Sequence, residues 1–78
     1  MSIGAYVFVN IKAGAGNKVL ESIKKIPEVK QAHLVTGLYD IIAYVEAPDM
    51  KVLGTTLMVN MQNVAGIDRT ITCVCVNN

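Results

Sequence analysis

The order in which two hydrophobic periodicities follow one another is the feature that most limits how this chain can fold. A period of two, typical of strands, runs through the first and the last of four expected strands, and the third is almost entirely apolar, as in a central strand covered on both faces. The four expected strands are residues 3–11, 29–36, 41–46 and 67–76. Val, Ile, Thr, Tyr and Phe are common in them, and these residue types favour strands.

Two segments with helical spacing lie between the first and second strands and between the third and fourth. Residues 16–26 predict the first helix, and Pro27 ends its pattern. The second is expected to begin at Pro48-Asp49, with Asp49 as its N-cap, and to end by Gly66. Its apolar side is expected to hold Val52, Leu53, Thr56, Leu57, Met61 and Val64.

This order, β-α-β-β-α-β, predicts an α+β fold of the ferredoxin-like type. Its sheet is expected to be antiparallel and four-stranded, with both helices on one face and the last strand at an edge beside the first. We expect residues 1–78 to form one domain, because typical domains contain about 50 to 200 residues.

Both faces of the expected sheet are apolar, although the two helices can cover only one. Hydrophobic residues make up 53% of the 78 residues, and so small a core is marginally stable by itself. We therefore expect two copies to pair through the uncovered faces, as in a dimeric α+β barrel. The spacing leaves open which set is uncovered. One choice is Tyr6, Phe8, Ile42, Tyr44, Val74 and Val76, and the other is the opposite set.

Charge and hydropathy exclude several classes of partner. A net charge of +1 with 17% charged residues argues against direct binding of nucleic acid. The longest apolar run, residues 41–45, is far shorter than the roughly 20 residues that span a membrane. The first residues lack a basic region followed by an apolar one, which is the pattern of a signal peptide. We expect a cytoplasmic protein without membrane contact.

Few residues suggest catalysis or metal binding. Gly14-Ala15-Gly16 precedes a helix, but the dinucleotide fingerprint needs a third glycine where Val19 stands. Cys73 and Cys75 lie on one strand face, and the single histidine, His33, lies on another strand. We expect the thiols to be buried as small apolar groups, and we predict no catalytic residue, no metal site and no cofactor.

The segment 37–40, Gly-Leu-Tyr-Asp, is the most informative for function. A structural turn explains it, because Gly37 tolerates positive φ and Asp40 accepts local backbone hydrogen bonds. The segment also suits a zwitterionic ligand, with amides and the hydroxyls of Thr70 and Thr72 for the carboxylate and Asp40 for the amine. Since the last strand is expected at an edge beside the first, these threonines would approach the turn across a subunit interface.

The chain resembles, over about residues 3–77, the effector-binding domain of the Lrp/AsnC family of transcriptional regulators, called the RAM domain. The segments that carry the resemblance are Ile26-Pro27-Glu28-Val29, residues 35–42 with the Gly-Leu-Tyr-Asp turn, and residues 64–72 with Gly-Ile-Asp-Arg-Thr-Ile-Thr. The combination is more specific than any one of the three.

The resemblance implies dimers that join into an octamer or decamer, with a small effector, usually an amino acid, bound between dimers. Family members that bind DNA carry a helix-turn-helix module before this domain. Residues 1–4 cannot supply one, so we expect a stand-alone sensing domain that modulates a DNA-binding Lrp/AsnC paralogue. The effector-binding residues carried over to this sequence are Thr36, Gly37, Leu38, Tyr39, Asp40, Thr70 and Thr72.

Three other interpretations stay open. The amino-acid-binding ACT domain has the same element order, and its ligand turn follows the first strand, where residues 13–17 are rich in glycine. Small dimeric α+β-barrel enzymes share the pairing of sheets but need a polar pocket, and turnover dependent on His33 would favour them. The third is an assembly partner that binds no ligand.

Overall fold

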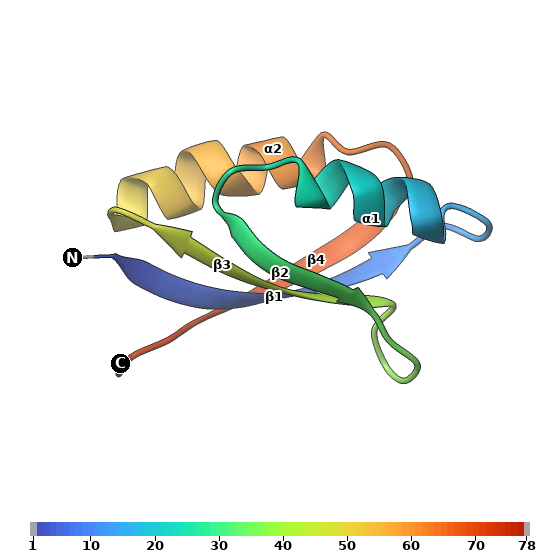
Figure 1. The fold of residues 1–78 in the computed structure, drawn as a ribbon, viewed down its shortest axis with the longest axis horizontal. Helices are drawn as coiled ribbons and strands as arrows, with labels where there is room; N and C mark the ends of the chain where they lie inside the picture. The colour runs from blue at the N-terminus through green and yellow to red at the C-terminus, as the bar shows by residue number, and fades with distance from the viewer. Residues whose placement is uncertain (1, 78) are drawn as a thin grey trace.

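A layer of helices covers one face of an antiparallel sheet in the computed structural model, which describes residues 2–77 (Figure 1). The elements are β1 (Ile3–Ile11), α1 (Gly16–Lys24), β2 (Val29–Leu34), β3 (Ile41–Ala47), a π-helical segment η1 (Val52–Leu57), α2 (Met58–Gln62) and β4 (Ile67–Val74). The four strands lie in the order β2-β3-β1-β4, so β4 is an edge strand beside β1. The predicted ferredoxin-like α+β fold is confirmed.

The core lies between the sheet and the helices. Alternation in β1 turns Ala5, Val7 and Val9 toward the helices, and all three are fully buried. The pairing of Val7 with Ala43 and of Val9 with Ile41 places the matching side chains of β3 on the same face. The helices contribute Val19, Ile23, Leu53, Leu57 and Met61, all buried. Each large apolar side chain removed from water in this way stabilises the fold by about 1.5–3 kcal/mol.

The second helical segment differs from the single α-helix that its spacing predicts. It begins as expected, because the Asp49 carboxylate accepts a hydrogen bond of 2.8 Å from the amide of Val52. Residues 52–57 then form the π-helix η1, and α2 adds five residues. The Thr55 hydroxyl donates to the carbonyl of Lys51, a back-bond that disturbs α-helical pairing, and Gly54 in the same turn disfavours the α-helix.

The apolar side of this segment still reaches the core through Leu53, Leu57 and Met61. The side chain of Thr56, also expected there, lies outside the described part of the structure. The helix ends at Gln62, and Gly66 stands beyond it, in the turn before β4. Within residues 2–77, no helix is both long enough and apolar enough to span a membrane.

The other face of the sheet, which we call the open face, is left uncovered by the described elements. In the register, Phe8 stands between Ile42 and Ile71, and Tyr6 stands between Tyr44 and Cys73. Directly paired residues share a face, so these side chains form the centre of the open face. Tyr6 is 46% exposed and Ile71 is 37% exposed.

The fourth strand corrects the two alternative sets of uncovered residues that spacing suggested. Val74 pairs with Ala5 and therefore lies on the helix side, whereas Ile71 and Cys73 lie on the open face. Val76, beyond the end of β4, is 98% exposed. Neither set is right as a whole. The pairing register between β1 and β4 decides whether the odd-numbered or the even-numbered residues of β4 lie on the open face, and spacing alone does not give that register.

Candidate functional site

The turn that connects β2 and β3 lies at one end of the sheet and projects away from the helix layer (Figure 1). It contains Thr36, which is exposed, and Gly37, whose φ of 144° favours glycine. Leu38 is 89% exposed. Tyr39 is half-buried, with its ring centre 4.9 Å from that of Phe8. The turn therefore directs one aromatic ring onto the open face and one aliphatic side chain into solvent.

Asp40 attaches the turn to the end of β1. Its amide donates to the carbonyl of Val9 at 2.9 Å, and its Oδ2 accepts from the amide of Ile11 at 2.9 Å. The pairing of β1 with β3 ends at Val9, so the amide of Ile11 has no partner on β3 and the carboxylate of Asp40 accepts its hydrogen bond instead. The structural role expected of Asp40 was a bond to a local amide of the turn, and the structure instead gives its carboxylate a partner on β1. A carboxylate has about four acceptor positions, which leaves capacity for a ligand.

Asn10 and Arg69 extend this site, and sequence reasoning missed both. The Asn10 side-chain amide donates to the carbonyl of Leu38 at 3.1 Å, and the Arg69 guanidinium donates to Asn10 Oδ1 at 3.3 Å. A carboxylate and a guanidinium thus belong to one hydrogen-bonded end of the sheet. The signal for Asn10 was a polar side chain at an alternating position of the first strand. Arg69 could be identified only from the strand register, which pairs it with Asn10.

Thr70 and Thr72 lie on the helix side of β4 and are not brought to the turn within one copy. Thr70 pairs with Val9, and Thr72 pairs with Val7. The Thr72 hydroxyl donates to the sulfur of Met58 at 2.8 Å. Because β1 stands between β4 and β3, two strand spacings, about 10 Å, separate Thr70 from the strand that the turn enters.

A hollow of about 320 Å³ adjoins the start of β4 and is lined in part by Thr70, Arg69 and Gln62. Since β4 is an edge strand, a neighbouring copy can approach this hollow without displacing another strand.

The two cysteines and the histidine do not form a site with one another. Cys73 is exposed and Cys75 is half-buried, so the expectation of buried thiols is wrong for the chain by itself. The cause is that the open face carries them and no element covers it. His33 is exposed and pairs with Ile42. Among the described residues, no three His, Cys, Asp or Glu side chains gather as a metal site would require.

Comparison with known proteins gives a match over nearly the whole chain. A sequence profile described as the Lrp/AsnC ligand binding domain matches residues 4–78. An uncharacterized HTH-type transcriptional regulator of Pyrococcus furiosus is 32% identical over 95% of this chain and 53% of its own length. The chain thus spans about half the length of the curated relatives it matches.

Solved structures show the same fold. A protein from Thermus thermophilus is 26% identical, with a TM-score of 0.90 and coverage of 97% of this chain and 95% of its own. A transcriptional regulator from Neisseria meningitidis in complex with L-methionine is 19% identical, with a TM-score of 0.86 over 96% of this chain and 50% of its own. At this identity, the second likeness establishes the fold alone.

Proposed function

The chain belongs to the Lrp/AsnC ligand-binding domain family, and from this premise we propose that it is a regulatory domain whose effector is an amino acid or a related zwitterion. The observation that carries the proposal is the end of the sheet where the Asp40 carboxylate accepts from the Ile11 amide, and where Asn10 links the Leu38 carbonyl of the turn to Arg69. It offers one negative and one positive side chain, the two charges that a zwitterion needs. The L-methionine complex of the Neisseria meningitidis regulator supports the ligand class.

In the proposed complex, the free acceptor positions of Asp40 bind the ammonium group of the effector. Arg69 and the exposed turn amides bind its carboxylate, because guanidinium forms paired hydrogen bonds with carboxylates. The proposed effector-binding residues are Thr36, Gly37, Leu38, Tyr39, Asp40, Thr70 and Thr72. We add Asn10 and Arg69 to the proposal because their hydrogen bonds lie beside the turn.

We propose that Thr70 completes the site from a neighbouring copy. Thr70 lines an edge hollow, whereas the Thr72 hydroxyl is engaged with Met58. The site is then shared between subunits, so an effector that binds it favours the assembled state over the separated one. Such a difference in affinity between the two states is what couples binding to regulation.

Assembly through the open face is the second part of the proposal. Two copies would bury the aromatic centre around Phe8 and Tyr44, and further contacts through the edges would build an octamer or decamer. The output would pass to a DNA-binding Lrp/AsnC partner in the cytoplasm. Family membership supports a regulatory role, since the curated relatives are transcriptional regulators. We therefore propose that residues 1–78 act as one domain, which binds an effector and catalyses no reaction.

The test is isothermal calorimetry with the standard amino acids, L-methionine first, on wild type and the Asp40→Asn variant. Asparagine keeps a carbonyl oxygen for the Ile11 amide but removes the negative charge, so the turn should persist. We expect affinity to fall about tenfold or more, because hydrogen bonds to charged groups contribute about 1.5–3 kcal/mol.

The matched control is Asp49→Asn, which changes a capping carboxylate in the helix layer and leaves a good N-cap. This variant should bind like wild type. If no standard amino acid bound at millimolar concentration, effector sensing of this class would be refuted. Undiminished binding by Asp40→Asn would remove Asp40 from the site.

A further inference from the structure

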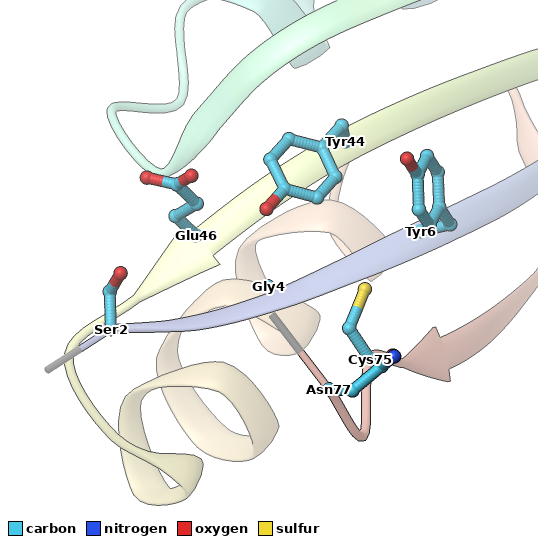
Figure 2. A pocket seen from close by; sticks show the side chains of 7 residues that line it. All are labelled: Ser2, Gly4, Tyr6, Tyr44, Glu46, Cys75 and Asn77. Carbon is cyan, nitrogen blue, oxygen red and sulfur yellow. The ribbon is translucent and has the colours of Figure 1, made fainter.

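The hollow of about 320 Å³ at the start of β4 lies at the edge of the sheet, beside the helix layer. Gln62, the last residue of α2, lines it together with Thr70, whose partner in the register, Val9, points toward the helices. A larger hollow, of about 520 Å³, lies on the open face at the other end of the sheet (Figure 2). The proposed pairing of two copies would cover that larger hollow but leaves the one at the edge accessible.

Groups that donate hydrogen bonds and groups that accept them both line the hollow at the start of β4, which we call the edge hollow. Asp68 contributes carboxylate acceptors, and Arg69 contributes guanidinium donors. The bond from Arg69 to Asn10 uses one of the five guanidinium N–H groups, which leaves donors for a ligand. The two charges cancel. The residues that line the edge hollow are Gln62, Ile67, Asp68, Arg69 and Thr70.

This lining fits a neutral side chain that both donates and accepts hydrogen bonds. An acidic side chain would meet the like charge of Asp68, and a basic one would meet the like charge of Arg69, and such contacts are unfavourable. A wholly apolar side chain would displace water from these groups without replacing its hydrogen bonds. A carboxamide can donate to Asp68 through its NH₂ group and accept from Arg69 through its carbonyl oxygen, with its methylene groups beside Ile67.

We infer that the effector of this domain carries a carboxamide side chain, as glutamine and asparagine do, and that the edge hollow of a neighbouring copy binds it. This inference rests on the proposed function, in which Thr70 of the neighbouring copy completes the site. Asp40 and Arg69 of the first copy bind the two charged groups that all amino acids share. Gln62 and Asp68 of the neighbouring copy are the specificity-determining residues, because they distinguish one side chain from another.

Isothermal calorimetry of the whole chain with five amino acids tests this inference. L-glutamate and L-methionine match L-glutamine closely in length but replace the carboxamide by a carboxylate and by a thioether. L-lysine supplies a cation, and L-asparagine a shorter carboxamide. We expect the tighter-binding carboxamide to bind about tenfold more tightly than each of the other three, because two hydrogen bonds are lost or opposed in them.

Two variants assign this selectivity to the edge hollow. Asp68→Asn removes the like charge that an acidic side chain meets, so the preference for the carboxamide over L-glutamate should fall about threefold or more. Gln62→Leu should weaken binding of the carboxamide about threefold and leave that of L-methionine nearly unchanged. Asp49→Asn and Asn60→Leu are the same changes at exposed positions of the helix layer, and both should keep the wild-type ratios.

The inference is overturned if L-methionine or L-glutamate binds as tightly as both carboxamides, or if the two variants keep the wild-type ratios. In either case, binding that still depends on Asp40 would support the proposed function, so the two failures are distinguishable. If no amino acid binds, the proposed function and this inference are both refuted.

Discussion

The two faces of the sheet are built from different residues although they alternate along the same strands. On β1 and β3 the helix side carries small or branched side chains, such as Ala5, Val7 and Ala43, all fully buried. The open side of these strands carries the larger rings of Tyr6 and Tyr44. Small side chains let the helices approach the sheet closely, and the large ones remain for contacts outside the single chain.

This difference separates stability from recognition. The covered face holds the side chains whose burial stabilises one copy, and changes there act on the free energy of unfolding. The open face ends at the β2–β3 turn on one side and at a hollow lined in part by Tyr6, Tyr44 and Glu46 on the other. Changes to its exposed side chains should act mainly on assembly and binding. The next three predictions compare positions on the two sides of the sheet, from the largest expected effect to the smallest.

Neighbouring isoleucines on β3 give the largest expected contrast. Ile41 is fully buried against the helices, whereas Ile42 lies half-buried on the open face. Ile41→Ala should lower the free energy of unfolding by about 2–5 kcal/mol at any protein concentration. The loss caused by Ile42→Ala should shrink on dilution, because it acts through assembly. Denaturant titration at two protein concentrations measures both, and a concentration-independent loss of equal size at Ile42 would contradict the division.

Two glycines give a contrast of intermediate size. Gly4→Ala should lower the free energy of unfolding by about 1–3 kcal/mol, because the added methyl group collides with Tyr44 on the open face. Gly54→Ala in the helix layer meets no atom within 4 Å, and alanine favours helix by about 1 kcal/mol. We expect it to be neutral or stabilising. Thermal unfolding would refute the assignment if both variants lost the same stability.

The smallest effect is on the titration of Tyr44. Its pKa is raised by burial and by Glu46, so the stability from the neutral phenol is complete below a pH of about 10 and is lost as pH rises through the folded pKa. Glu46→Gln should lower the pKa of Tyr44, because burial and the smaller effects of Cys75 and Tyr6 then remain. Tyrosinate absorbance measures this shift. Glu28→Gln is the control, and an unchanged titration in Glu46→Gln would contradict the contact.

The sequence predicted the fold because its two periodicities are long and their order is diagnostic. It could not predict the side on which β4 places Ile71 and Val74, since a shift of one residue in register exchanges the faces. The spacing also could not reveal the π-helix at Val52–Leu57, where Thr55 and Gly54 alter a turn inside a helical pattern.

Only the contiguous residues of the candidate site could be predicted from the sequence. Residues 36–40 are contiguous, and turn chemistry identifies Asp40 directly. Asn10 and Arg69 are 59 positions apart in the sequence, so their contact emerges only when β1 and β4 pair. The close approach of Tyr44 to Gly4 is likewise a contact between two strands, and neither strand's sequence shows it alone.

The central claim is that the open face is the surface through which copies assemble, and molecular mass in solution tests it most directly. One chain has a mass of 8.4 kDa. We expect light scattering to give a multiple of this mass for wild type, and a sharp fall toward one chain for Ile42→Glu with its circular dichroism retained. Val59→Glu, the same charge on an exposed residue of α2, should assemble like wild type. A single-chain mass for wild type, or an unchanged mass for Ile42→Glu, would contradict the account.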